Sequence, residues 1–107
     1  MKCSIKFTET AKQDLRDIAI YVAEQSGSKE TAKKFVAELR KKCLILEDFP
    51  ESGAIPHDRV LISSGYRFLV HGEYLLFYLY KSKDNTAYLT AVFNAKRDYF
   101  RVMKKYL

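Results

Sequence analysis

The chain has 107 residues, 48 % of them hydrophobic and 30 % charged. This length holds one domain, residues 1–107, and the composition is that of a globular protein with a core. A formal net charge of +6 favours a polyanion, such as nucleic acid, or an acidic protein as partner. The N-terminal stretch lacks signal-peptide features, and the longest mostly apolar stretch, Tyr74–Tyr80, is too short to span a bilayer. We therefore expect a cytoplasmic protein that uses no membrane.

The sequence has two cysteines, Cys3 and Cys43, which are far apart and have no CxxC spacing. Isolated cysteines are typical of reduced thiols in cytoplasmic proteins. Cys43 falls on the apolar stripe of a predicted helix and is expected to be a small core residue. The sequence leaves a Cys3–Cys43 disulfide open.

The first half of the chain predicts a strand followed by two helices. Met1–Phe7 alternates loosely and indicates a short strand. Thr8 is suited to cap a first helix, which Gly27 ends, and Ser28 is suited to cap the next one. The second helix is expected from about Lys29 to about Glu47. The short turn at Gly27 and Ser28 between the two helices predicts an antiparallel hairpin.

The second half predicts strands joined by short turns. The β-type segments are Val60–Ile62, Arg67–Val70, Tyr74–Tyr80 and Thr86–Phe93. The tail, Ala95–Leu107, is compatible with a short final helix. The expected fold is therefore α+β, in the order β-α-α-β-β-β, with the helical hairpin packed on a three- to four-stranded antiparallel sheet.

Known catalytic motifs of hydrolases, kinases and metalloenzymes do not occur in the sequence. His57 and His71 lie near predicted turns without an evident partner, and we interpret both as solvated loop residues. We expect neither a metal site, nor a cofactor, nor a small-molecule ligand.

Basic and aromatic residues gather in the second half of the chain. In an antiparallel sheet, the start of one strand can lie beside the end of a later one, which would bring Arg67 near Arg97 and Tyr99. Two guanidinium groups and a phenol in one hollow can hold a phosphodiester and stabilise its transition state. The alternative is structural: Arg67 pairs with a nearby carboxylate, Arg97 is a helix-end charge, and Tyr99 belongs to the core.

Three segments in chain order resemble the RelE/ParE superfamily of bacterial toxins. The segment from Thr8 to Tyr21 is similar to the A-x-x-D-L-x-x-I-x-x-Y first helix of ParE-type members. The segment from Leu46 to Gly53 is similar to the family's exit from the helical hairpin. Gly65-Tyr66-Arg67, Tyr74 to Tyr78, and Lys96-Arg97-Asp98-Tyr99 resemble the course of its sheet and tail.

This resemblance implies a toxin of a type II toxin–antitoxin module, of the kind involved in plasmid stabilisation, with an antitoxin as partner. RelE-like members cleave mRNA on the ribosome, whereas ParE-like members poison DNA gyrase without known hydrolytic chemistry. In the first case Arg67, Arg97 and Tyr99 would be catalytic, although Tyr106 is a second candidate for the tyrosine. The nuclease's two lysines are replaced by Asp58 and Val60, with Arg59 or His57 as stand-ins. That departure slightly favours the ParE-like reading.

Two further sets of residues are candidates for partner binding. Residues expected to contact the target or RNA are Arg59, Tyr66, Lys96 and Arg101. Residues expected to contact the antitoxin, an acidic amphipathic segment by charge complementarity, are Lys33, Lys34, Lys41, Lys42, Lys104 and Lys105. The alternatives are a merely solvated charged face and, for the whole protein, a basic binding module without toxicity.

Overall fold

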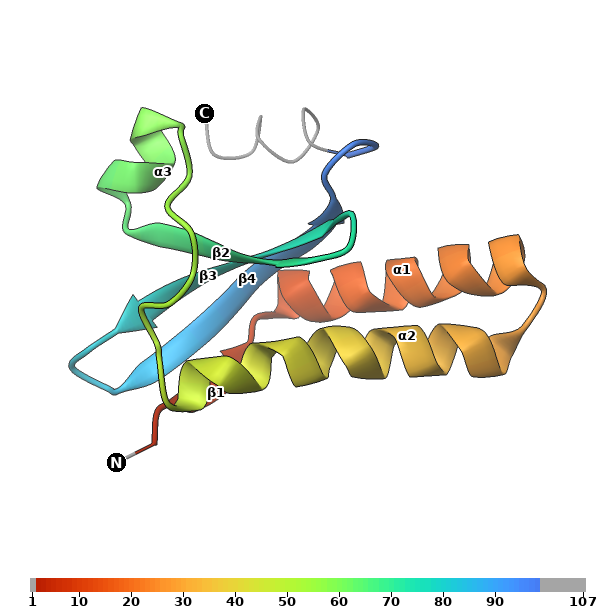
Figure 1. The fold of residues 1–107 in the computed structure, drawn as a ribbon, viewed down its shortest axis with the longest axis horizontal. Coiled ribbons are helices and arrows are strands. Elements are labelled where there is room, and N and C mark those ends of the chain that lie inside the picture. Colours follow the sequence, from red (N-terminus) through yellow and green to blue (C-terminus); the bar gives the residue numbers. More distant parts are fainter. Residues whose placement is uncertain (1, 99–107) are drawn as a thin grey trace.

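The structure is a computed structural model that describes residues 2–98. Two long helices lie side by side against a twisted four-stranded sheet (Figure 1). The elements are β1 (Ser4–Phe7), α1 (Glu9–Ser26), α2 (Lys29–Lys42), the 3-10 helix η1 (Cys43–Glu47), α3 (Arg59–Ser63), β2 (Tyr66–His71), β3 (Tyr74–Lys81) and β4 (Thr86–Asn94). The α+β order expected from the sequence is confirmed, while most of the predicted final helix lies outside the described residues.

Local capping signals set the limits of the helical hairpin. The Thr8 hydroxyl accepts a hydrogen bond from the Ala11 amide at 3.2 Å, and α1 ends at Gly27, whose φ of 70° is left-handed. Ser28 then caps α2 through the Thr31 amide at 3.1 Å. All three predicted caps are confirmed. The predicted second helix continues to Glu47, but it tightens to 3-10 geometry from Cys43 onward.

The sheet has the strand order β1-β4-β3-β2. Strands β2, β3 and β4 form the predicted antiparallel meander. Strand β1 instead pairs with β4 in parallel, from Ser4 opposite Thr86 to Phe7 opposite Leu89, so the sheet is mixed. Sequence pattern indicates a strand but not its distant partner, and parallel pairing becomes possible because a long connection separates the two strands.

The interpretation of Val60–Ile62 as a strand is wrong, because these residues form α3. One Asp58 carboxylate oxygen accepts hydrogen bonds from the amides of Val60 and Leu61 at 2.9 and 3.1 Å. This side-chain cap starts a helical turn even though the apolar run is typical of a strand. Of the three apolar residues only Leu61 is buried, while Val60 and Ile62 are exposed.

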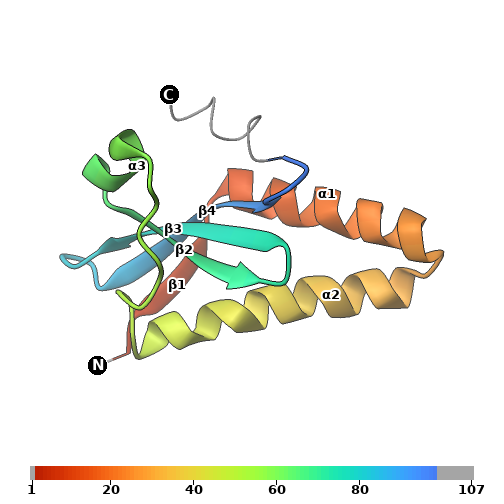
Figure 2. The ribbon, with the colours of Figure 1, turned by 45° about the horizontal axis from the view of Figure 1, so that its top comes forward.

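The sheet separates two apolar clusters. On one face, α1, α2 and η1 contribute Leu15, Leu39 and Leu46 to a core shared with Leu76 and Leu89. The second cluster lies on the other face, where α3 packs beside β2, as two views of the ribbon show (Figure 2). Its buried members are Leu61, Phe77, Ala91 and Phe93. Among residues 2–98, no helix is long and apolar enough to cross a membrane.

A part-buried polar contact fixes α1 to the sheet. A β-bulge interrupts the β3–β4 register between Phe77 and Tyr78. Just beyond it, the Val92 amide donates a hydrogen bond to the Asp14 carboxylate at 2.9 Å. A β-bulge redirects the side chains and backbone groups beside it. A helix side chain that accepts a hydrogen bond from a strand amide there fixes where the helix lies on the sheet. Asp14 therefore sets the position of α1 over β4.

We expect Asp14→Ala to lower the free energy of unfolding by about 1.5–3 kcal/mol, because it removes a charged acceptor from a part-buried amide. The matched control is Asp17→Ala on the same helix, whose carboxylate accepts an exposed hydrogen bond from Gln13. The control should cost less than about 1 kcal/mol. Urea unfolding followed by circular dichroism measures both, and equal losses would contradict the anchoring role.

The two cysteines are buried free thiols, so the structure contains no Cys3–Cys43 disulfide. Cys43 is a core residue as predicted, and burial raises its pKa to about 12. A raised pKa in the folded state means that the thiolate form opposes folding. The associated stability is present below the unfolded-state pKa of about 8.5 and is lost as the pH rises toward 12.

At pH 8 we expect Cys43 to react with a disulfide reagent at least about a hundred-fold more slowly in the folded protein than in urea, because its thiolate is scarce and covered. The measurement is absorbance of the released thiol, with Cys3→Ala protein isolating the Cys43 signal. Fast reaction in the folded state would show that this part of the core opens readily.

Candidate target-binding site

Arg67 lies on the helix-covered side of β2, near the outer edge of the sheet. It pairs in register with Tyr78 of β3 and shares a sheet face with buried Leu69. Its guanidinium donates a hydrogen bond to the Gly53 carbonyl at 3.1 Å. Arg67 thus holds the connection between η1 and α3. Among residues 2–98 it forms no ion pair with a carboxylate, which the structural alternative supposed.

Gly53 is held from its other side by Tyr78. The Gly53 amide donates to the buried Tyr78 hydroxyl at 2.9 Å, and burial raises the pKa of that phenol. A Cβ at Gly53 would lie 2.6 Å from Tyr78 side-chain atoms, a distance that packed atoms do not tolerate. The sequence contains this glycine inside the hairpin-exit motif, but the pattern does not reveal its contact with a residue 25 positions later.

Arg97 lies at a corner formed by the end of β4 and helix α1. Its guanidinium sits 3.8 Å from the centre of the Tyr21 ring and 3.3 Å from the Asp98 carboxylate. Asn94 fixes this corner, since its side-chain oxygen accepts from the amides of Lys96 and Arg97 at 3.0 and 2.8 Å. Stacking on an aromatic face holds the cation while leaving its side chain 40 % exposed.

The structure does not bring Arg67 and Arg97 together, so the predicted shared hollow is wrong in its geometry. Arg67 is level with Tyr78, whereas Arg97 follows Asn94, which is level with Tyr74. Four residues of strand separate these levels by about 13 Å, and β3 lies between the two strands. Strand β4 runs in the same direction as β2. It passes the level of Arg67 and ends at Asn94, level with the last residue of β2.

The other predicted target contacts lie apart from Arg67, since Arg59 and Tyr66 belong to α3 and to the face of β2 opposite to Arg67, and Lys96 lies beside Arg97. Arg59 is exposed at the start of α3, and Tyr66 begins β2 with its ring 6.3 Å from that of Phe77. Lys96 is at the Arg97 corner and forms an ion pair with Glu73 at 3.2 Å. The hydrogen bond and the charge of Lys96 lower the pKa of the Glu73 carboxyl. Five predicted residues lie outside the described residues: Tyr99, Arg101, Lys104, Lys105 and Tyr106.

The interpretation of His71 as a solvated loop residue is wrong. It is the last residue of β2, its Nε2 lies 3.7 Å from the Glu38 carboxylate, and its ring meets Phe35 edge-on. Glu38 and Phe35 are far from His71 in the chain, so the residues next to His71 do not indicate these contacts. His57 is exposed in a loop, as predicted. Among residues 2–98, no group of three or more metal-ligating side chains is assembled.

The four lysines predicted on α2 are all exposed, and two of them lie in different surroundings. Lys33 faces α1 across a shallow groove between the helices. Lys42 lies at the other end of α2, beside Ile45 and Val70 at the edge of the sheet.

Comparison with solved structures identifies the class of fold. The chain superposes on the ParDE system of P. aeruginosa with a TM-score of 0.71 and 21 % identity, covering 87 % of this chain and 96 % of that one. It superposes on the RelBE2 complex of Mycobacterium tuberculosis with a TM-score of 0.65 and 18 % identity, covering 88 % and 92 %. For the isolated E. coli RelE toxin the values are 0.57 and 19 %, covering 98 % and 99 %. The fold is therefore the one shared by these ParDE and RelBE structures.

Residues 5–99 match the family described as the ParE toxin of the type II toxin–antitoxin system parDE. The chain belongs to this family, and the predicted RelE/ParE membership is confirmed. No curated protein matches the sequence.

We expect Gly53→Ala to cost about 1–3 kcal/mol of stability, because the added methyl group displaces the Tyr78 ring. Tyr78→Phe removes the acceptor of the Gly53 amide and should cost about 1–3 kcal/mol. Since both changes act on one contact, the double variant should lose at least about 0.5 kcal/mol less than the sum. Thermal unfolding of the wild type, the two single variants and the double variant measures the coupling. Strictly additive losses of stability would contradict the contact between Gly53 and Tyr78.

Proposed function

We propose that this toxin arrests growth by binding a macromolecular target without cutting it, and that the target is DNA gyrase. The observation that carries the proposal is the separation of Arg67 from Arg97, each of which is already engaged by its own surroundings. The match of residues 5–99 to the ParE family supports the same target class. Arg97, Lys96 and the turn before β3 supply the exposed charged corner that would meet the target.

A RelE-like cleavage of ribosome-bound mRNA is the second candidate, supported by likeness of fold to RelE toxins. Such a reaction needs cations that converge on one phosphate. Arg67 donates a hydrogen bond to the Gly53 carbonyl and holds the connection between η1 and α3. Its guanidinium is therefore poorly placed to bind the phosphate of a substrate. A non-toxic binding module is the third candidate, and growth arrest on induction separates it from both toxins.

We expect the purified protein to inhibit supercoiling by gyrase and to leave mRNA intact on translating ribosomes. Arg97→Ala should weaken the inhibition several-fold, because a rim cation contributes to association by charge. Supercoiling and RNA cleavage assays are run on the same preparation.

The matched control is Lys83→Ala, which removes one charge from the turn at the other end of the sheet and should leave inhibition unchanged. Unimpaired supercoiling at excess toxin, together with cleaved mRNA, would replace this proposal with the nuclease. Equal weakening by both variants would show that only net charge matters.

A further inference from the structure

The apolar and polar positions of the first-helix motif lie on α1, and the structure gives them different tasks. Three of them are buried in the core: Ala11, Leu15 and Ile18. Asp14 accepts the hydrogen bond from the Val92 amide. Tyr21 differs from these four, since it is 38 % exposed and belongs to neither apolar cluster of the described residues. Core packing therefore does not account for this tyrosine.

Tyr21 contacts Arg97, whose guanidinium lies 3.8 Å from the centre of its ring. Asp14 and Tyr21 are seven positions apart, which is about two turns of helix, so they lie on the same side of α1. Because Asp14 holds this side against Val92 of β4, Tyr21 lies where the chain leaves β4 at Asn94. The position of α1 on the sheet thus brings the ring under the cation.

Two further side chains surround the guanidinium of Arg97. The Asp98 carboxylate lies 3.3 Å away. Tyr74 of β3 is buried, and its ring packs edge-on against Phe35 of α2 at 5.3 Å. Burial opposes the charge of the arginine, but Asp98 and hydrogen bonds with Tyr21 and Tyr74 outweigh this effect and raise its pKa. The cation is therefore held from α1, from β3 and from the turn after β4.

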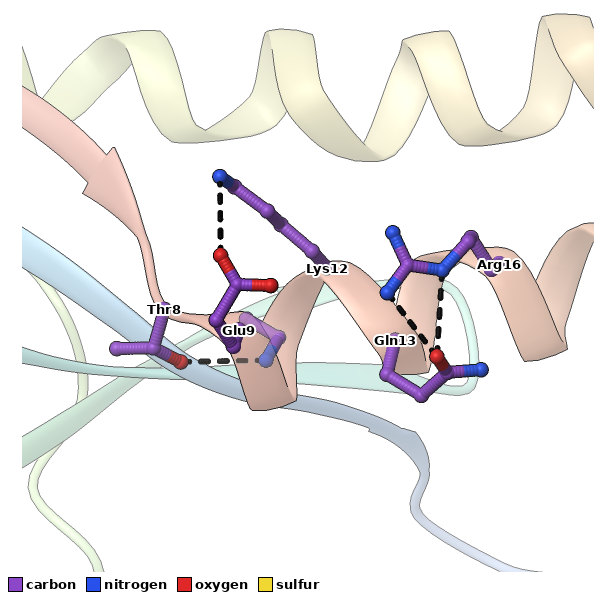
Figure 3. A network of polar contacts seen from close by, with 6 residues as sticks. Thr8, Glu9, Lys12, Gln13 and Arg16 are labelled. Carbon is purple, nitrogen blue, oxygen red and sulfur yellow. Dashed lines mark hydrogen bonds and ion pairs between the residues drawn. The ribbon is translucent and has the colours of Figure 1, made fainter.

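The polar side chains at the start of α1 show a weaker way of holding a cation. Lys12 lies 3.5 Å from Glu9, and Arg16 donates to Gln13 at 3.0 and 3.3 Å, so each partner is within one turn of the same helix (Figure 3). Exposed contacts of this kind order a long side chain only weakly. Arg97 is held by several elements while its side chain stays 40 % exposed. A side chain that is already ordered loses less conformational entropy when a partner binds.

We propose that Tyr21 is a positioning residue for target binding, whose ring holds the Arg97 guanidinium in one orientation at the exposed corner. The proposal rests on the proposed function, in which Arg97 contacts the target. Tyr21 acts through Arg97 and not by touching the target itself. The aromatic face carries this role, because the attraction between a cation and a ring comes from the π-system and not from the hydroxyl.

The test compares the full-length wild type, Tyr21→Leu, Arg97→Ala and the double variant in the gyrase supercoiling assay. Tyr21→Leu should raise the toxin concentration for half-inhibition at least about three-fold, because the stacked orientation is lost. In the Arg97→Ala background the same change should cost less than about two-fold, because a residue that acts through Arg97 has nothing left to position. Tyr21→Phe keeps the ring and should stay within about two-fold of the wild type.

Nuclear magnetic resonance tests the orientation without any target. The Arg97 Nε proton should resonate upfield of those of the other arginines, because it lies over the Tyr21 ring. Tyr21→Leu should remove this shift, and Tyr21→Phe should keep it. The matched control is Tyr88→Leu near the other end of β4, where a half-buried tyrosine donates to Asp84 at 2.8 Å. The control should change neither inhibition nor the Arg97 signal, and circular dichroism confirms that each variant is folded.

Additive losses in the cycle, an equal loss in Tyr21→Phe and Tyr21→Leu, or an Arg97 signal that Tyr21→Leu leaves unchanged would each overturn the inference. If the wild type leaves supercoiling unimpaired, the gyrase target is removed, and the same variants are compared by growth arrest on induction. A loss of growth arrest in Tyr21→Leu that depends on Arg97 would then support the positioning role at another target. A wild type that neither inhibits gyrase nor arrests growth would overturn both proposals.

Discussion

The packing of the helical hairpin against one face of the sheet is the constraint on which the other features depend. Four short strands do not form a stable sheet unless one face is covered by apolar side chains. Leu15, Leu39 and Leu46 provide that cover, and the Asp14 carboxylate fixes the helix position by accepting from the Val92 amide. With α1 held there, Tyr21 lies where Arg97 can stack on it. The hairpin thus builds the core and also provides the aromatic ring on which Arg97 stacks.

The loop between η1 and α3 is ordered from the sheet side by a second, polar constraint. Tyr78 is fully buried, yet its hydroxyl accepts from the Gly53 amide, so its desolvated oxygen is satisfied. Arg67 completes the arrangement through the Gly53 carbonyl. Ala54 then forms a bridge with Phe68 through backbone hydrogen bonds of 2.8 and 3.0 Å. An arginine that a family resemblance marks as functional is consequently part of the scaffold here.

Features determined by neighbouring residues could be predicted from the sequence, and features determined by distant partners could not. Thr8, Gly27 and Ser28 act within one helical turn, so their pattern gives the helix limits. The parallel pairing of β1 and the separation of Arg67 from Arg97 depend on how whole strands are placed. Helix α3 has a local signal in the Asp58 cap, but the apolar run that follows this residue is equally typical of a strand.

The parallel pairing of β1 with β4 has a consequence for biosynthesis. Ser4 and Thr86 are neighbours in the sheet but 82 positions apart in the chain. At about 5–20 residues per second, the ribosome needs about 4–16 s to deliver the partner of the first strand. Until then β1 lacks its partner, so the four-stranded sheet can be completed only after most of the chain has been made.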